Sequence, residues 1–146
     1  MTAPARAAAG IAHLATLVCS GCGRGPEPIA DRFVDAYFVQ ASQKTALGLS
    51  TGLATRKLEE ELALVSSARA GGKVPFARPT IRVRRRHVEV AGDRAQVRYE
   101  IELSSGAASS QRRALVVLRL GASERWRVSN WSLSDAVPDM GNHAAK

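Results

Sequence analysis

The sequence predicts an α+β domain in which N-terminal helices pack on a curved, four-stranded antiparallel sheet, a cone-like roll. Three observations predict it. Apolar residues recur at spacings of three and four up to about residue 70, and at a spacing of two from residue 80 onward. Four strand-like runs follow one another through short turns, which is typical of an antiparallel meander. Two of these runs shift their alternation by one residue, which indicates bulges that bend the sheet.

The size and composition indicate one folded domain. The chain has 146 residues, of which 45% are hydrophobic, and carries a formal net charge of +8. A domain of this length buries a core without help from disulfides or metal. The composition excludes a disordered chain, collagen and a multi-pass membrane protein. Both cysteines lie within the first 22 residues, so no disulfide is expected in the body of the protein.

The first 22 residues have the three-part layout of a secretory signal. Arg6 precedes an apolar run over residues 7–18, and small residues follow. This run is too short to span a membrane. The end, Ser20-Gly21-Cys22, resembles the lipobox of bacterial lipoproteins, although Cys19 stands where that family prefers Leu. The resemblance implies a signal peptide over residues 1–21, acylation of Cys22, and a lipid-anchored protein that faces the periplasm in the bacterial cell envelope.

The alternative for this segment is an Ala-rich first helix of a cytosolic domain. The run from Gly21 to Pro26 is a poor continuation of such a helix, because it contains three glycines and a proline. Residues 22–27 have no apolar periodicity and are interpreted as a tether. The domain proper is predicted over residues 28–134, followed by a flexible tail over 135–146.

Three helices are expected in the first half of the domain. Pro28 suits the first turn of a helix over residues 28–41, and a second helical stretch covers roughly 43–50. The third places Leu58, Leu62 and Val65 on one face and ends at Gly71-Gly72. Its charged residues are expected to face solvent: Arg56, Lys57, Glu59, Glu60 and Glu61.

Four strands are expected in the second half. They cover residues 80–90, 94–103, 112–120 and 125–133, joined by a turn at 91–93 and loops at 104–110 and 121–123. The second alternates without error, with its inward positions at Ala95, Val97, Tyr99, Ile101 and Leu103. Phase shifts in the first and last strands predict the two bulges.

This order of elements resembles the nuclear transport factor 2-like superfamily. The resemblance covers residues 28–134 and rests on a Gly-Asp turn that opens a strand, Gly92 to Val97, and on the pattern Trp126-x-Val128-x-x-Trp131. The superfamily, a cystatin-like roll, includes ketosteroid isomerases and SnoaL-type cyclases. The sequence is more similar to small bacterial lipoproteins of this fold with no assigned activity. The resemblance implies a cone that encloses a pocket.

Candidate pocket residues follow from that resemblance. In catalytic members, acids and tyrosines line the open end of the cone, where burial tunes their pKa values. The candidates here are Tyr99, Tyr37, Asp35 and His87, with Asp135 beyond the last strand. No pair matches the isomerase spacing, so no catalytic residue is assigned, and core aromatics with polar caps are the favoured interpretation. No cofactor or metal is predicted, because the sequence has no phosphate loop, nucleophile elbow or metal motif.

Positive charge is concentrated in the sheet. Residues 80–133 contain 11 basic and 5 acidic residues, whereas residues 22–79 contain 8 and 6. A basic outer surface is predicted around Arg84, Arg86, Arg94 and Arg98, and it would attract anionic headgroups or polyanions. The alternative is an ordinary solvated face whose arginines reflect composition bias. Nucleic acid is not an expected partner, because the aromatic side chains that could stack on bases are predicted to point inward.

Three functions are consistent with these patterns. The favoured one is a lipid-anchored envelope protein whose non-catalytic domain binds a small apolar ligand or a protein partner, with the membrane contacted through the N-terminal lipid. The second is an isomerase- or cyclase-like enzyme that uses Tyr99 with Asp35 or His87. The third is a cytosolic polyanion-binding module.

Overall fold

The structure, a computed structural model, describes residues 25–71 and 79–136. The predicted signal peptide, Cys22 and the residues from 137 onward lie outside the described residues. Three helices precede four strands: α1 (Pro26–Val34), α2 (Gln43–Leu47), α3 (Leu53–Ala70), β1 (Thr80–Ala91), β2 (Arg94–Ser105), β3 (Ala108–Leu120) and β4 (Trp126–Asp135). The predicted α+β class and the order of helices before strands are confirmed.

Several element boundaries differ from those predicted. Helix α1 begins at Pro26, two residues before the predicted domain start, since proline in the first turn has no N–H to leave unpaired. The long first helix changes at a π-helical turn, η1 (Asp35–Val39), where the Gln40 amide donates to the Asp35 carbonyl at 2.8 Å. Asp135, placed in the tail by the sequence, is the last residue of β4.

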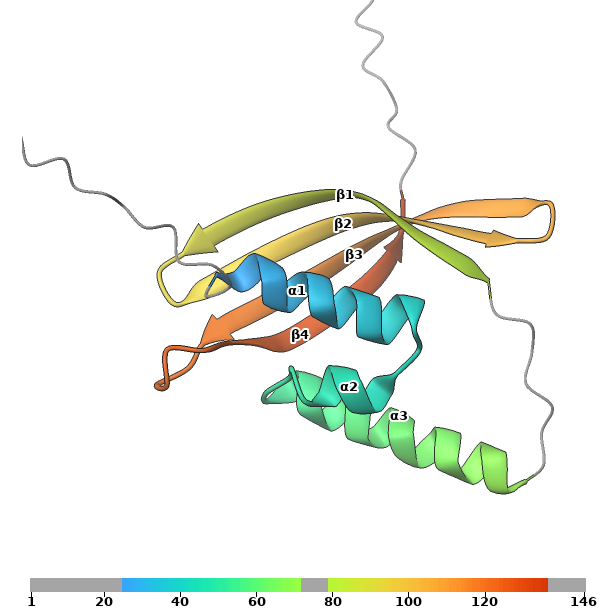
Figure 1. Ribbon diagram of the computed structural model, residues 1–146, viewed down its shortest axis with the longest axis horizontal. Helices are drawn as coiled ribbons and strands as arrows, with labels where there is room; N and C mark the ends of the chain where they lie inside the picture. Colours follow the sequence, from blue (N-terminus) through green and yellow to red (C-terminus); the bar gives the residue numbers. More distant parts are fainter. Residues whose placement is uncertain (1–24, 72–78, 137–146) are drawn as a thin grey trace, which may run out of the picture.

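The four strands form one antiparallel sheet in the order β1-β2-β3-β4 (Figure 1). Both predicted bulges are present. One lies in β1 between Val83 and Arg85, and the other lies in β4, where Val117 of β3 pairs with Asn130 but Leu118 pairs with Val128. The predicted loop over 104–110 is wrong, because β2 and β3 continue as a ladder to Ser105 and Ala108.

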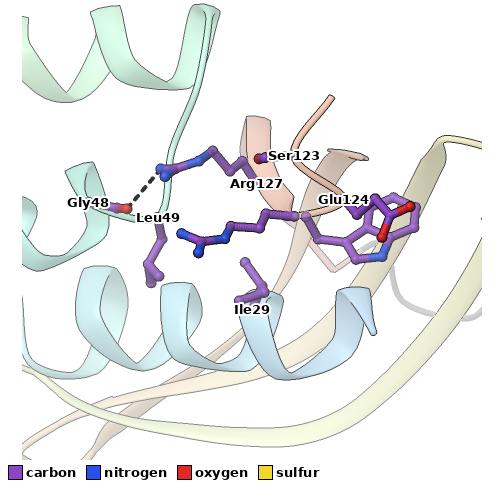
Figure 2. Close-up of a pocket in the computed structure, with 8 residues that line it drawn as sticks. Ile29, Gly48, Leu49, Ser123, Glu124 and Arg127 are labelled. Atoms are coloured by element: carbon purple, nitrogen blue, oxygen red, sulfur yellow. Dashed lines mark hydrogen bonds between the residues drawn. The ribbon is translucent and has the colours of Figure 1, made fainter. Parts of the chain in front are cut away.

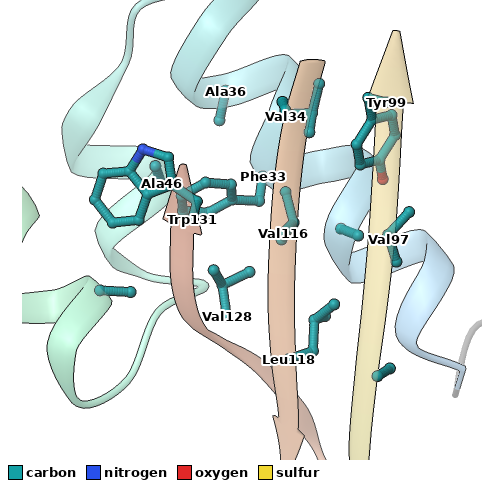
Figure 3. Packing of buried hydrophobic residues seen from close by; sticks show 14 of the residues in the cluster. Phe33, Val34, Ala36, Ala46, Val97, Tyr99, Val116, Leu118, Val128 and Trp131 are labelled. Atoms are coloured by element: carbon teal, nitrogen blue, oxygen red, sulfur yellow. The ribbon is translucent and has the colours of Figure 1, made fainter. Parts of the chain in front are cut away.

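A helical layer covers one face of the sheet, with α1 lying across the strands and α2 and α3 beside it (Figure 1). The core lies between the layers and is filled by apolar side chains such as Phe33, Val116 and Val128 (Figure 3). These three and Leu58 are fully buried. The predicted alternation of β2 is confirmed, since Ala95, Val97, Tyr99 and Ile101 are each at most 2% exposed. We call the uncovered side of the sheet the open face.

The segment after α2 extends the sheet beyond β4. Ser50 forms a parallel bridge with Val128, the Thr51 amide donates to the Val128 carbonyl at 2.8 Å, and the Val128 amide donates to the Leu49 carbonyl at 2.9 Å. This pairing ends α2 at Leu47, three residues before the predicted end. Among the residues that the structure describes, no helix combines the length and hydropathy needed to cross a bilayer.

Candidate functional site

Tyr99 is the central polar residue between the layers. Its ring is buried on β2, and its hydroxyl donates to Asp31 Oδ1 of α1 at 2.8 Å. The second oxygen of Asp31 accepts a hydrogen bond from the Arg86 guanidinium of β1. Burial, followed by the adjacent Asp31 carboxylate, raises the pKa of Tyr99 well above its usual value. The phenol therefore stays protonated, with its proton directed at a carboxylate.

Arg86 was predicted to belong to the basic outer surface, and this prediction is wrong. Arg86 pairs in register with Tyr99, and residues directly opposite each other on neighbouring strands share a face of the sheet. The bulge between Val83 and Arg85 shifts the phase of β1, so Arg86 points toward the helices rather than toward the open face.

Tyr37 forms a second phenol–carboxylate pair. Its hydroxyl lies 2.8 and 2.9 Å from the two carboxylate oxygens of Glu61, and its ring packs against Phe33 and Trp131. Burial and then the Glu61 carboxylate raise the pKa of Tyr37 above its usual value. The prediction that Glu61 faces solvent is wrong. Glu61 lies three residues after Leu58, which places it on the same side of α3 as that buried leucine.

Lys57, also predicted to face solvent, turns inward. Its Nζ donates to Asn130 Oδ1 at 2.7 Å and to the Trp131 carbonyl at 3.2 Å, and lies 5.1 Å from the centre of the Trp131 ring. Asn130 Oδ1 also accepts from the Trp131 amide at 2.9 Å. Lys57 therefore joins α3 to the bulged part of β4.

The structure brings two of the four predicted pocket residues together: Tyr99 and His87 both line a recess of about 700 Å³, whose lining does not include Tyr37 or Asp35. Tyr99 and Tyr37 point inward but donate to different carboxylates. Asp35 is exposed and accepts from Gln40, while His87 is exposed, 3.3 Å from Glu89 Oε1. Asp135, the remaining candidate, pairs with Arg112.

Asp31, Glu61 and Lys57 were not predicted from the sequence as hydrogen-bond partners of buried or half-buried residues. Asp31 carried a usable signal, because it lies three residues before the buried Val34 and so shares its side of α1.

Much of the predicted basic surface is neutralised by neighbouring carboxylates. Arg84 donates to Glu102, and Arg98 donates to Glu89 at 2.7 and 3.3 Å. These hydrogen bonds hold the pKa values of Glu102 and Glu89 below the usual range. Among the described residues Arg94 forms no ion pair and no side-chain hydrogen bond, so it is the remaining cation of the predicted four.

A recess of about 540 Å³ lies where α1, the segment after α2 and the start of β4 meet (Figure 2). Ile29, Leu49 and Trp126 supply apolar surface, and Arg125 and Arg127 supply charge; Ser123, Glu124 and Gly48 complete the lining. Arg127 Nη1 donates to the Gly48 carbonyl at 3.1 Å (Figure 2). The volume is within the range of small-molecule sites.

The recess could not be predicted from the sequence, because it depends on the pairing of residues 49–51 with β4. Within residues 25–71 and 79–136, no group of three or more His, Cys, Asp or Glu side chains is placed to hold a metal ion.

Comparison with known proteins gives a fold. No protein-family model and no curated protein matches the chain. A solved structure does: the crystal structure of a ketosteroid isomerase-like protein from Erwinia carotovora atroseptica SCRI1043 matches with a TM-score of 0.52 and 19% identity, over 77% of this chain and 95% of that one. This similarity shows that the chain shares the α+β cone fold of that ketosteroid isomerase-like protein.

Proposed function

We propose that this chain is a lipid-anchored protein of the bacterial cell envelope, facing the periplasm, whose domain binds a ligand or partner without catalysing a reaction. The observation that carries the non-catalytic part is the engagement of both interior phenols. Tyr99 donates to Asp31 and Tyr37 donates to Glu61. A phenol that stabilises a reacting substrate must direct its proton at the substrate. Here each proton already has a carboxylate acceptor.

The recess beside Trp126 is the binding site that we favour. Its apolar side chains, Ile29, Leu49 and Trp126, come from three separate parts of the chain, and Arg125 and Arg127 line it as well. Such a combination suits a ligand with an apolar body and a negatively charged or polar end.

The anchor rests on Ser20-Gly21-Cys22 and fits the position of α1. Helix α1 begins at Pro26, and its Ile29 lines the recess. Only residues 23–25 separate Cys22 from the helix. Acyl chains on Cys22 would anchor the domain because each buried CH₂ contributes about 0.8 kcal/mol to membrane affinity.

Replacement of Cys22 by Ala tests the anchor. In cells that process lipoproteins, we expect the native chain to sediment with membranes and to start at residue 22 by mass spectrometry. The variant should retain residues 1–21 and lose acyl mass. A variant with the same membrane association and the same mass as the native chain would show that Cys22 carries no lipid.

The alternative, an isomerase- or cyclase-like activity, is favoured by one observation: the hydroxyl of the buried Tyr99 lies 2.8 Å from the Oδ1 atom of the partly exposed Asp31. The discriminating assay is turnover of a β,γ-unsaturated ketone by the purified full chain. Turnover that is lost in Tyr99→Phe would establish the alternative. Equal rates with and without the protein would remove it.

A further inference from the structure

Three arginines lie side by side at one end of the open face. Arg94 of β2 pairs in register with Arg119 of β3, and Arg119 pairs with Arg127 of β4. Each is adjacent to a buried residue of its strand, so the three side chains start from the open face. The Arg127 side chain then reaches past the edge of β4 to the Gly48 carbonyl after α2. Side chains directly opposite on neighbouring strands lie about 5 Å apart at Cβ, and like charges in that position destabilise a sheet.

The arrangement is not compensated within the described part of the chain. Arg94, Arg119 and Arg125 form no ion pair and no side-chain hydrogen bond there, and Arg127 bonds only the neutral Gly48 carbonyl. The two carboxylates of the adjoining turns, Asp93 and Glu124, form no ion pair with them either. A bound anion would relieve this repulsion.

Three of these arginines, Arg119, Arg125 and Arg127, line a second recess. It has a volume of about 240 Å³ and lies beside the larger one; its polar side chains are Thr51, Arg119, Ser123, Arg125 and Arg127. No carboxylate lines it. These side chains supply three guanidinium groups and two hydroxyls, which can donate hydrogen bonds to the oxygens of a phosphate group. A guanidinium binds phosphate oxygens in a bidentate manner.

The two recesses share Ser123, Arg125 and Arg127. An anionic group held by the arginines would therefore lie next to the apolar surface of Ile29, Leu49 and Trp126. This juxtaposition matches a molecule whose phosphate joins a polar end to an apolar body, which is the chemistry of a phospholipid.

Helix α1, which follows the proposed anchor along the chain, begins at the same end of the molecule. Figure 1 shows that the start of α1, the turn between β1 and β2 and the turn between β3 and β4 lie at one end of the sheet. Three peptide steps join Cys22 to Gly25, a reach of at most about 11 Å. A lipid on Cys22 would hold this arginine-rich end against the membrane.

We propose that Arg119, Arg125 and Arg127, with Thr51 and Ser123, form a phosphate-binding site for the headgroup of an anionic phospholipid. The phosphate site stands on the geometry of the recess alone. The membrane as the source of the phosphate rests on the proposed anchor.

The test uses the full chain carrying Cys22→Ser, so that no acyl chain contributes to binding. Two probes are compared: glycerol 3-phosphate in solution, and vesicles of phosphatidylcholine with or without an equal part of phosphatidylglycerol. The site variant is Arg119→Gln with Arg125→Gln. The matched control is Arg82→Gln with Arg113→Gln, which removes the same charge from exposed positions outside the recess.

We expect the phosphatidylglycerol vesicles to bind, and the site variant to weaken this binding by roughly 25-fold, since each basic residue near an anionic surface contributes about fivefold. The control should weaken it by less than about threefold. Should the site variant fold poorly, by circular dichroism, Arg119→Lys with Arg125→Lys keeps the charge and removes the bidentate geometry. We expect this variant to lose part of the binding.

The outcomes separate the sources of the phosphate. Loss of vesicle binding specific to the site variant supports the headgroup. Specific loss of glycerol 3-phosphate binding, with vesicles unaffected, supports a phosphate site and overturns the membrane source. Equal losses in the site and control variants, or no binding to either probe, overturn the phosphate site. Because the chain is not acylated, none of these results depends on the anchor, which the Cys22→Ala experiment tests separately.

Discussion

Replacement of Tyr99 by Phe removes the hydrogen bond that joins α1 to β2 at the centre of the fold. The hydroxyl donates to a charged acceptor, Asp31, at 2.8 Å. Such a bond contributes about 1.5–3 kcal/mol to stability. The Asp31 side chain is 45% exposed and keeps its Arg86 partner, so water replaces part of the lost interaction. We therefore expect Tyr99→Phe to lower the free energy of unfolding by about 1.5 kcal/mol.

A double-mutant cycle isolates the pair. Tyr99→Phe, Asp31→Ala and the double variant are unfolded in urea, and we expect the two changes to be coupled by about 1–1.5 kcal/mol. Asp35→Ala provides the matched control, because Asp35 is the exposed carboxylate four residues along the same helical segment. Its coupling to Tyr99 should be near zero. Additive effects of Tyr99→Phe and Asp31→Ala, within about 0.5 kcal/mol, would refute the reasoning.

Three further predictions concern the interior. Trp131→Ala leaves a cavity between α1, α3 and β4, so thermal unfolding should show that the free energy of unfolding falls by about 3–5 kcal/mol. A fall of less than about 1 kcal/mol would contradict the packing described. Lys57→Met keeps the apolar stem but removes the hydrogen bonds to β4, so urea unfolding should show that the free energy of unfolding falls by about 1–2 kcal/mol. The control is Arg56→Met, at the exposed neighbouring position, which should lower it by less than about 0.5 kcal/mol. The free energy of unfolding should fall as the pH rises above about 10, because Tyr37 and Tyr99 lose their protons there in the unfolded chain but keep them in the folded one, where their pKa values are raised. The fall, measured by urea unfolding, should be shallower in Tyr37→Phe with Tyr99→Phe; an identical fall would exclude these phenols as its cause.

The strands were predictable because one face of the sheet is buried and the other is not. A side-chain period of two then separates Ala95, Val97 and Tyr99 from their polar neighbours, and a bulge is visible as a shift of that period. The two bulges were located for this reason. Each signal is local, so it is fully present in the sequence.

The charged residues of α3 were not predictable in the same way. Lys57 and Glu61 have long side chains whose apolar stems can lie against a core while the charged ends find partners. Those partners, Asn130 and Tyr37, lie 73 and 24 residues away along the chain. A helical pattern identifies the buried face by its apolar residues only, so polar residues on that face are assigned to solvent.

The distribution of charge on the sheet follows from register, which composition alone does not contain. Glu89 forms an ion pair with Arg98, and Glu102 forms one with Arg84. Both pairs join β1 to β2, so neither lies at the turn between β3 and β4. Near that turn, Arg94, Arg119 and Arg127 lie opposite one another on β2, β3 and β4, with no carboxylate among them. A cluster of arginines therefore lies at the end of the sheet from which α1 begins (Figure 1). A one-residue slip in β3 would turn Arg119 toward the core and Leu118 away from it, so the packing of the core fixes the position of the charge.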